Sequence, residues 1–240
     1  MSEKQTLIVT AVMSIVTALL MGTCFGMLGA FFGYPEIIRE TPQVLLTRLY
    51  EQRHIVPYLY YGLGIAGVLI VFTALLIHES IRIFGGSIFS VMGRVSGVIV
   101  GVLLFTGILR YVVLFPYLAD QYMNGNSEKE TLILVFQSFQ YHVGVCVTEH
   151  AMFFFLSLML VFFSVALLKT GRLGRWTAIF GIATAVLLFY GNFELFDVPY
   201  AFSVNRLASK LSGVWLIFLG ITIIRFSMKQ YPRVLQQTVR

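Results

Sequence analysis

Six long apolar runs constrain this chain more than any other feature, because lipid allows few folds. They lie at about residues 7–33, 55–77, 89–118, 144–168, 176–193 and 209–228 of a 240-residue sequence. At about 1.5 Å of rise per residue, each run can cross a hydrocarbon layer of about 30 Å as a helix. A segment in lipid has no water to bond its backbone, so it must close its own hydrogen bonds. The sequence therefore predicts an all-α, polytopic membrane protein, a bundle of about six transmembrane helices.

Composition supports a single membrane domain over residues 1–240. The chain is 58% hydrophobic and 12% charged, whereas a soluble domain carries about a quarter charged residues. The six spans leave no room for a separate soluble domain of ordinary size. A net charge of +6 would suggest nucleic acid in a soluble protein, but here we attribute it to the positive-inside bias. We therefore expect the lipid bilayer, and no nucleic acid, as the partner.

The distribution of Lys and Arg between the loops predicts the orientation. With a cytoplasmic N-terminus, ten basic residues lie on the inner side and six on the outer side. The inner residues are Lys4, Arg82, Arg94, Lys169, Arg172, Arg175, Arg225, Lys229, Arg233 and Arg240, and the outer ones are Arg39, Arg48, Arg53, Lys129, Arg206 and Lys210. This excess predicts that both termini lie in the cytoplasm.

The first outer loop carries the pattern of a short amphipathic helix. Thr41 and Pro42 predict an N-cap followed by proline at the first helical position. Leu45, Leu46 and Leu49 then recur at helical spacing among polar residues. We expect this helix on the outer membrane surface or over the bundle, and we favour a sealing role over a gating one.

Residues 131–143 are amphipathic rather than wholly apolar. A single helix from 131 to 168 would be about 57 Å long, nearly twice the hydrocarbon thickness. Such a helix must tilt and protrude or bend near Gly144, and we expect an outer amphipathic segment that feeds the fourth span.

Glycine spacing indicates where helices approach closely. Gly93, Gly97 and Gly101 form a GxxxGxxxG ridge in the third span, and Gly22 and Gly26 form a shorter one in the first. Small residues at this spacing let helix backbones meet. We expect these two spans to be central in the bundle, and we consider a homo-oligomer through Gly93, Gly97 and Gly101.

Ionisable residues near one end of the spans form a candidate functional layer, because such groups are costly at membrane depth. Counting from the inner basic residues places Arg110 about 24 Å up the third span and Glu149 about 30 Å up the fourth. Glu194 and Arg206 reach about 28 Å on the fifth and sixth spans. The candidate ligand-binding residues of this outer polar layer are Arg110, His142, Glu149, His150, Glu194 and Asp197.

Two interpretations of this layer compete. The simpler one, which we favour, treats the residues as ends of spans whose side chains snorkel to the headgroups. In the other they converge on one site, where a carboxylate and an arginine bind an anionic headgroup or relay protons. His142 and His150 could also bind a metal with Glu194 if their helix is continuous. No HExxH, GxSxG, Walker or Rossmann motif names a reaction, and we expect neither a metal nor a cofactor.

Three functions stay open at this point. The first is a non-enzymatic inner-membrane protein that binds a lipid, a hydrophobic small molecule or a membrane partner through the outer polar layer. The second is a membrane enzyme for a lipid or isoprenoid-like substrate, with Glu149 or Glu194 as general base and Arg110 holding an anionic group. The third is a small transporter, disfavoured because the sequence shows no internal repeat.

Short motifs in the second half of the chain resemble those of a known membrane family. Residues 167–176, Leu-Leu-Lys-Thr-Gly-Arg-Leu-Gly-Arg-Trp, with Ile179-Phe180-Gly181, resemble its "L-Y-x-S-x-L-I-P-R-W-L-x-x-x-G" signature. Val204-Asn205-Arg206, with Val214-Trp215-Leu216-Ile217 and Gly220, is similar to its closing "N-E…V-W-L-I-x-K-G" stretch, and Gly93-Arg94-Val95 lies where it often has "F-R-I". The family is DUF4386, an uncharacterised prokaryotic membrane family.

This resemblance implies a fold and a location for the protein. It implies a six-span bundle in a prokaryotic cytoplasmic membrane, and it provides no catalytic residue. Two positions depart from the pattern, since Gly174 replaces a proline and Arg206 replaces an acidic residue.

Overall fold

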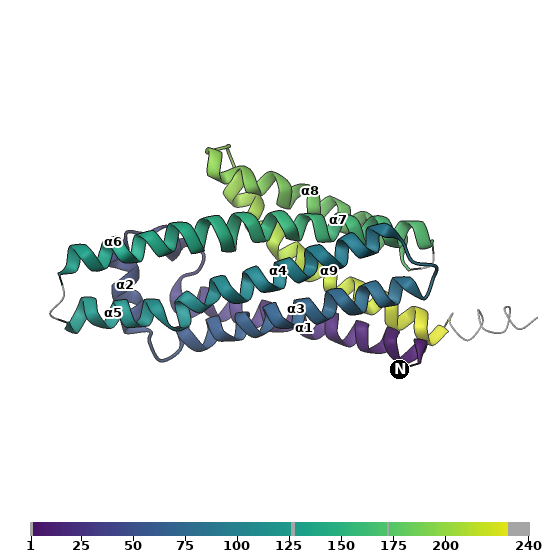
Figure 1. The fold of residues 1–240 in the computed structure, drawn as a ribbon, viewed down its shortest axis with the longest axis horizontal. Coiled ribbons are helices and arrows are strands. Elements are labelled where there is room, and N and C mark those ends of the chain that lie inside the picture. The colour runs from purple at the N-terminus through teal and green to yellow at the C-terminus, as the bar shows by residue number, and fades with distance from the viewer. Residues whose placement is uncertain (1, 126–127, 172, 230–240) are drawn as a thin grey trace, which may run out of the picture. The chain divides into compact units, whose positions relative to one another are not determined.

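All the secondary structure in the described residues is helical, and no strand occurs among them. The computed structural model describes residues 2–125, 128–171 and 173–229. Six of its helices are long and apolar enough to cross a membrane (Figure 1): Glu3–Phe32, Val56–Arg82, Ile88–Asn124, Lys129–Thr170, Arg175–Phe196 and Ala201–Met228. The predicted all-α fold with six spans is confirmed. Arg172, Arg233 and Arg240, which entered the orientation argument, lie outside the described residues.

The third helix is slightly longer than predicted, and the fourth is much longer. The third continues from α4 (Ile88–Val112) into α5 (Leu114–Asn124), and the fourth runs from α6 (Lys129–Phe139) to α7 (Met152–Thr170). Residues 131–143 therefore belong to the fourth helix. Its 42 residues correspond to about 63 Å, roughly twice the hydrocarbon thickness. Between α6 and α7 the helix does not break at Gly144 but winds as a π-helix over Gln140–Ala151, here called the π segment.

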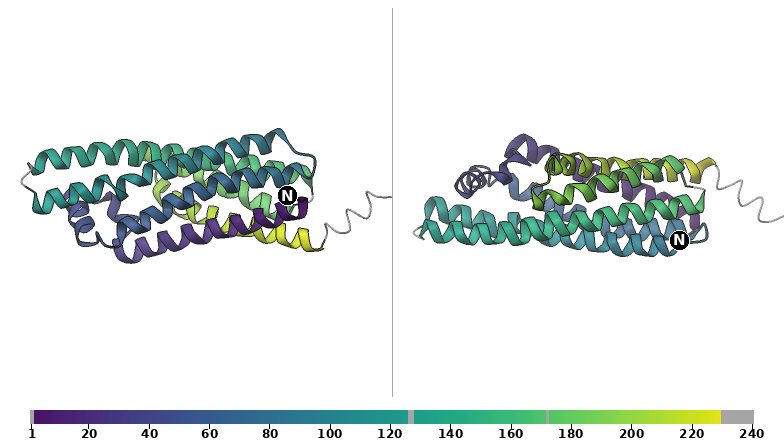
Figure 2. Two further views of the ribbon diagram at one scale, coloured as in Figure 1. Left: turned by 60° about the horizontal axis from the view of Figure 1, so that its bottom comes forward. Right: turned by 90° about the horizontal axis from the view of Figure 1, so that it is seen from above.

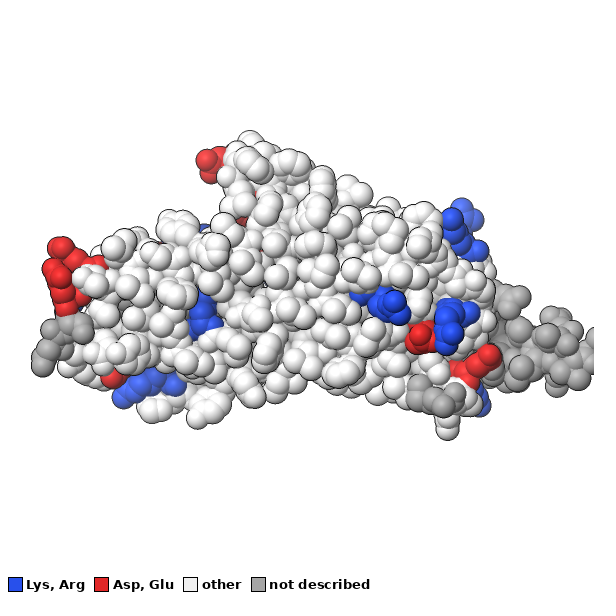
Figure 3. Space-filling model, viewed as in Figure 1, with Lys and Arg blue, Asp and Glu red and all other residues white. Residues whose placement is uncertain are grey.

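Charged side chains are sparse along the flanks of the long helices. Figure 3 shows a mostly uncharged face on which Lys, Arg, Asp and Glu gather mainly towards the ends of helices. Apolar side chains on the exposed faces, such as Leu19, Phe72 and Val186, face outward. Such faces suit lipid, because a hydrocarbon surrounding needs no polar partner.

Contacts divide the chain into two compact units, which are described one at a time. Unit 1 comprises Met1–Leu19, Leu69–Gly101 and Phe153–Arg240, and unit 2 comprises Leu20–Val68 and Val102–Met152. The long helices contribute residues to both units. That residues 1–240 act as a single membrane domain stays a prediction.

In unit 1, α8 (Arg175–Gly191) and α9 (Ala201–Lys229) form an antiparallel pair and lie side by side in Figures 1 and 2. Trp215 on α9 is fully buried, and its indole Nε1 donates a 3.0 Å hydrogen bond to the backbone oxygen of Thr177. Gly181 makes room for it, because a Cβ there would lie 2.5 Å from the indole nitrogen. The two stretches that resemble family motifs, one with Trp176 and one with Trp215, thus lie in the same helical hairpin.

The glycine ridge of α4 packs inside unit 1. A Cβ at Gly93 would lie 2.8 Å from the ring of Phe163, and one at Gly97 would lie 2.5 Å from the Cβ of Ala74. Gly93, Gly97 and Gly101 are all buried within the chain. The homo-oligomer contact considered from the sequence is therefore not supported, because the ridge already faces the chain's own side chains.

The shorter glycine ridge of α1 (Glu3–Phe32), in contrast, is exposed. Gly22 and Gly26 are exposed, and a Cβ at either would meet nothing within 4 Å among the described residues. The expectation that this ridge packs the first span at the centre is wrong within unit 2.

The predicted amphipathic helix is present in unit 2 as α2 (Pro42–Glu51), and it packs against α5 and α6. Its buried residues are Leu45, Leu46 and Leu49, as the periodicity predicts. Thr41 occupies the N-cap position, but its side chain makes no capping hydrogen bond. The apolar face of α2 therefore covers helices of its own chain.

The α8–α9 pair can be tested through the two tryptophans of the chain. Trp215→Ala should destabilise the protein by roughly 3–5 kcal/mol, because it removes a buried aromatic side chain and its hydrogen bond. Trp176, also in this hairpin, is 81% exposed and serves as the matched control, with no expected change beyond about 0.5 kcal/mol. Thermal unfolding followed by circular dichroism in mild detergent measures both. Equal losses in the two variants would contradict this packing.

Candidate ligand-binding site at a buried arginine

Arg110, in the third long helix, is only 7% exposed and points into unit 2. Its Nη1 donates hydrogen bonds to the backbone oxygen of Gly107 and, at 3.0 Å, to Oγ1 of Thr148 in the π segment. Its Nε is buried and has no partner among the described residues. Arg110 therefore does not snorkel to a headgroup, and that interpretation is wrong for this residue.

Two glycines allow the third and fourth helices to approach here. A Cβ at Gly107 would lie 1.9 Å from Oγ1 of Thr148, and a Cβ at Gly144 would lie 2.9 Å from Nη2 of Arg110. The Thr148 hydroxyl also donates a 2.6 Å bond to the backbone oxygen of Val143, five residues earlier. Within a π-helix the backbone bonds also run to the fifth residue, and such segments are frequent at functional sites. The π winding and the two glycines together position Thr148 against the guanidinium.

Aromatic rings form the other side of the Arg110 environment. The guanidinium carbon lies 4.8 Å from the ring centre of Tyr111 and 5.8 Å from that of Phe115. Tyr111 in turn stacks on Tyr60, with ring centres 4.0 Å apart. The faces of these rings attract the cation, which offsets part of the penalty of burying it. They do not supply a negative charge.

The acidic candidate in this unit, Glu149, is engaged by a residue from the connection after α1. Nη2 of Arg39 lies 2.6 Å from Oε2 of Glu149, and Nη1 lies 3.3 Å from Oε1, which makes the pair bidentate. The two side chains are 35% and 20% exposed. Both carboxylate oxygens of Glu149 are thus bound, and Arg110 has no ion pair among the described residues.

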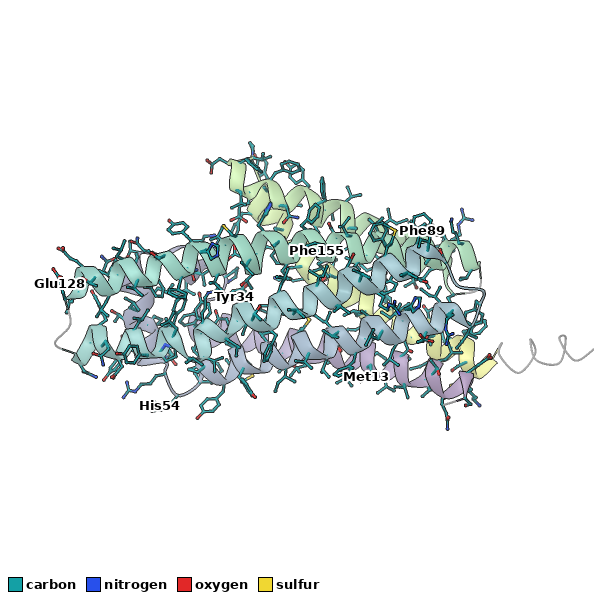
Figure 4. All side chains as sticks on the ribbon, in the orientation of Figure 1. Met13, Tyr34, His54, Phe89, Glu128 and Phe155 are labelled. Atoms are coloured by element: carbon teal, nitrogen blue, oxygen red, sulfur yellow. The ribbon has the colours of Figure 1, made fainter. Side chains whose placement is uncertain are left out.

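Tyr34, labelled in Figure 4, lies in the turn that ends α1. Gly33 adopts φ +79°, which lets the Tyr34 amide donate to the backbone oxygen of Leu28 and close the helix. Burial raises the pKa of the Tyr34 phenol, and the nearby carboxylate of Glu149 raises it further, while Arg39 and Arg110 oppose this. The phenol therefore stays protonated, and it shares the electrostatic environment of all three charged residues.

Four buried polar atoms in unit 2 have no hydrogen-bond partner within the described part of the chain. They are the hydroxyl of Tyr60, Nε of Arg110, Nε2 of Gln140 and Nδ1 of His150. Gln140 is tied to this region through its Oε1, which accepts a 3.4 Å bond from the hydroxyl of Tyr111. Buried polar groups in proteins normally have partners, so a group of exceptions marks a place where a partner can bind. We call Tyr60, Arg110, Gln140 and Thr148, which are connected to one another directly or through Tyr111, the polar cluster.

The remaining predicted residues are His142, Glu194 and Asp197. His142 is exposed on the π segment, so its environment differs from that of the buried His150 Nδ1. Glu194 lies in the 3-10 turn Asn192–Phe196 of unit 1, and Asp197 follows it, exposed, at φ +53°. No three His, Cys, Asp or Glu side chains in the described part of the chain are placed to hold a metal ion. The metal alternative with His142, His150 and Glu194 therefore has no support.

Sequence reasoning missed most of the groups that surround Arg110. Thr148, Gln140 and the tyrosines Tyr34 and Tyr60 carry no charge, and Arg39 was counted only as a loop residue. Gly144 was the one available signal, because the expected irregularity of the fourth helix falls where the π segment lies.

These features define a polytopic α-helical membrane protein with a buried, cationic polar cluster inside one of its units. The model of a domain of unknown function, DUF4386, matches residues 10–225, so the chain belongs to that family. No curated protein and no solved structure matches the chain.

The fit between the two helices can be tested with a matched pair of glycines. Gly107→Ala should destabilise the protein by about 1–3 kcal/mol, because the new Cβ displaces Thr148 from Arg110. Gly22→Ala should stabilise the protein by about 0.5–1 kcal/mol, because its Cβ enters open space and alanine favours a helix. Thermal unfolding in the same detergent compares the two. A Gly107→Ala protein as stable as Gly22→Ala would contradict the close approach.

Proposed function

We propose that this protein is a multi-pass protein of the prokaryotic cytoplasmic membrane that binds a lipid or a hydrophobic small molecule at the polar cluster. The observation that carries the proposal is the set of buried polar atoms without partners around Arg110. Hydrocarbon offers no hydrogen bonds, so these atoms gain a large benefit from a bound polar group. Both termini lie in the cytoplasm in this proposal, which rests on the loop charges and on the family resemblance.

The enzyme and transporter alternatives have less support. An enzyme with Glu149 as general base needs a carboxylate that can take a proton from substrate, but both of its oxygens are bound by Arg39. For transport, no observation adds to the sequence argument. Binding is therefore the function that we put forward.

The proposal predicts a retained ligand that depends on the polar cluster. The protein purified in mild detergent should carry a stoichiometric extra mass in native mass spectrometry. The Gln140→Leu variant should lose most of that mass, because it removes an unpartnered group of the polar cluster.

A matched control uses the same residue type on the same helix. Gln137→Leu removes an amide outside the polar cluster, and it should keep the ligand. A bare wild-type chain would refute the proposed function. Equal loss in both variants would show that the retained mass does not report on the cluster.

A further inference from the structure

The ligand's chemistry can be inferred from the charge balance around Arg110, given the proposed function on which this inference rests. A guanidinium stays protonated in proteins, so burial cannot neutralise it. The carboxylate of Glu149, which follows Thr148 in the chain, is held by Arg39 in a bidentate pair. Tyr111, Phe115, Gly107 and Thr148 contact Arg110 without bringing a negative charge. A buried cation of this kind favours an anion from outside the chain.

The guanidinium edge formed by Nε and Nη2 defines the shape of that anion. Nη1 is used by Gly107 and Thr148, whereas Nε has no partner. Nε and Nη2 form one edge with two parallel N–H groups, and Nη2 lies so close to Gly144 that a Cβ there would come within 2.9 Å of it. Such an edge matches two oxygens of a carboxylate or a phosphate. We infer that the ligand carries a carboxylate or phosphate group that pairs with the Nε and Nη2 edge of Arg110.

The neutral members of the polar cluster fit the same group. The Gln140 amide nitrogen is a donor, and the Tyr60 hydroxyl can donate to an oxygen. Since an anion of this type offers several acceptor sites, it can satisfy more of these groups than an alcohol or an ester. The headgroup, rather than the apolar tail, sets the specificity.

A panel of probes with one tail tests the inference on the full-length protein after delipidation in detergent. Oleic acid, oleyl phosphate and oleyl alcohol share a chain and differ in the polar group. At least one of the two anionic probes should bind roughly 30-fold or more tightly than the alcohol, because a buried charge pair is at stake. Affinities come from titrations followed by thermal shift or thermophoresis.

Variants of Arg110 connect the preference to this side chain. Arg110→Gln should remove the difference between anionic and neutral probes, and Arg110→Lys should keep part of it, since lysine has the charge but not the paired edge. Arg48→Gln, at an exposed arginine of the same unit, should leave it unchanged. If Arg110→Gln does not fold, the comparison of the three probes on the wild-type protein still decides.

The outcomes separate this inference from the proposed function. Oleyl alcohol binding as tightly as both anions would overturn the inference and leave lipid binding intact. Acetate or inorganic phosphate binding as tightly as the tailed anions would support the anionic site and contradict a lipid ligand. No probe binding, together with no retained mass, would overturn both.

Discussion

The buried guanidinium of Arg110 is the constraint on which the rest of the site depends. It stays charged, and hydrocarbon offers it neither water nor counter-ions. Several features of the surroundings position the guanidinium and stabilise its charge. Glycines at 107 and 144 let the third and fourth helices approach, Thr148 accepts one of its hydrogen bonds, and the ring of Tyr111 faces the cation. The π segment belongs to the same arrangement, because its winding presents Thr148 to the arginine. These contacts hold the charge in place but do not neutralise it, and we therefore expect a bound anion to pair with it.

Most of the fold could be predicted from the sequence, because the thickness of lipid sets a length that few helices exceed by chance. The six apolar runs correspond to the six spanning helices, and the periodicity of Leu45, Leu46 and Leu49 identified α2. The lengths of the third and fourth helices could not be predicted in the same way. Their extensions, α5 and α6, are amphipathic because they pack against α2, so an apolar-run criterion ends too early. The direction in which each glycine ridge faces also depends on tertiary packing. It cannot be predicted from the spacing of the glycines alone.

The candidate site was only partly predictable. Arg110 and Glu149 stood out because charged residues are rare in apolar spans, but their partners did not. Thr148, Gln140 and Tyr60 are uncharged and unremarkable in a membrane helix, and Arg39 lies 110 residues from Glu149 in sequence. The π winding has no recognised local sequence signal, and it changes which side chains share a face. For an arginine near the end of a span, a side chain that snorkels to the headgroups is the more common arrangement. The burial of Arg110 within unit 2 shows that this arrangement does not apply to it.

The most direct test of this account is a cryo-electron microscopy map of the protein extracted with its native lipids into nanodiscs. The account predicts π winding over 140–151, the Arg110 side chain between Thr148 and Tyr111, and ligand density against its Nε and Nη2 edge. A regular α-helix over these residues, with Arg110 extended to the headgroup region, would contradict it.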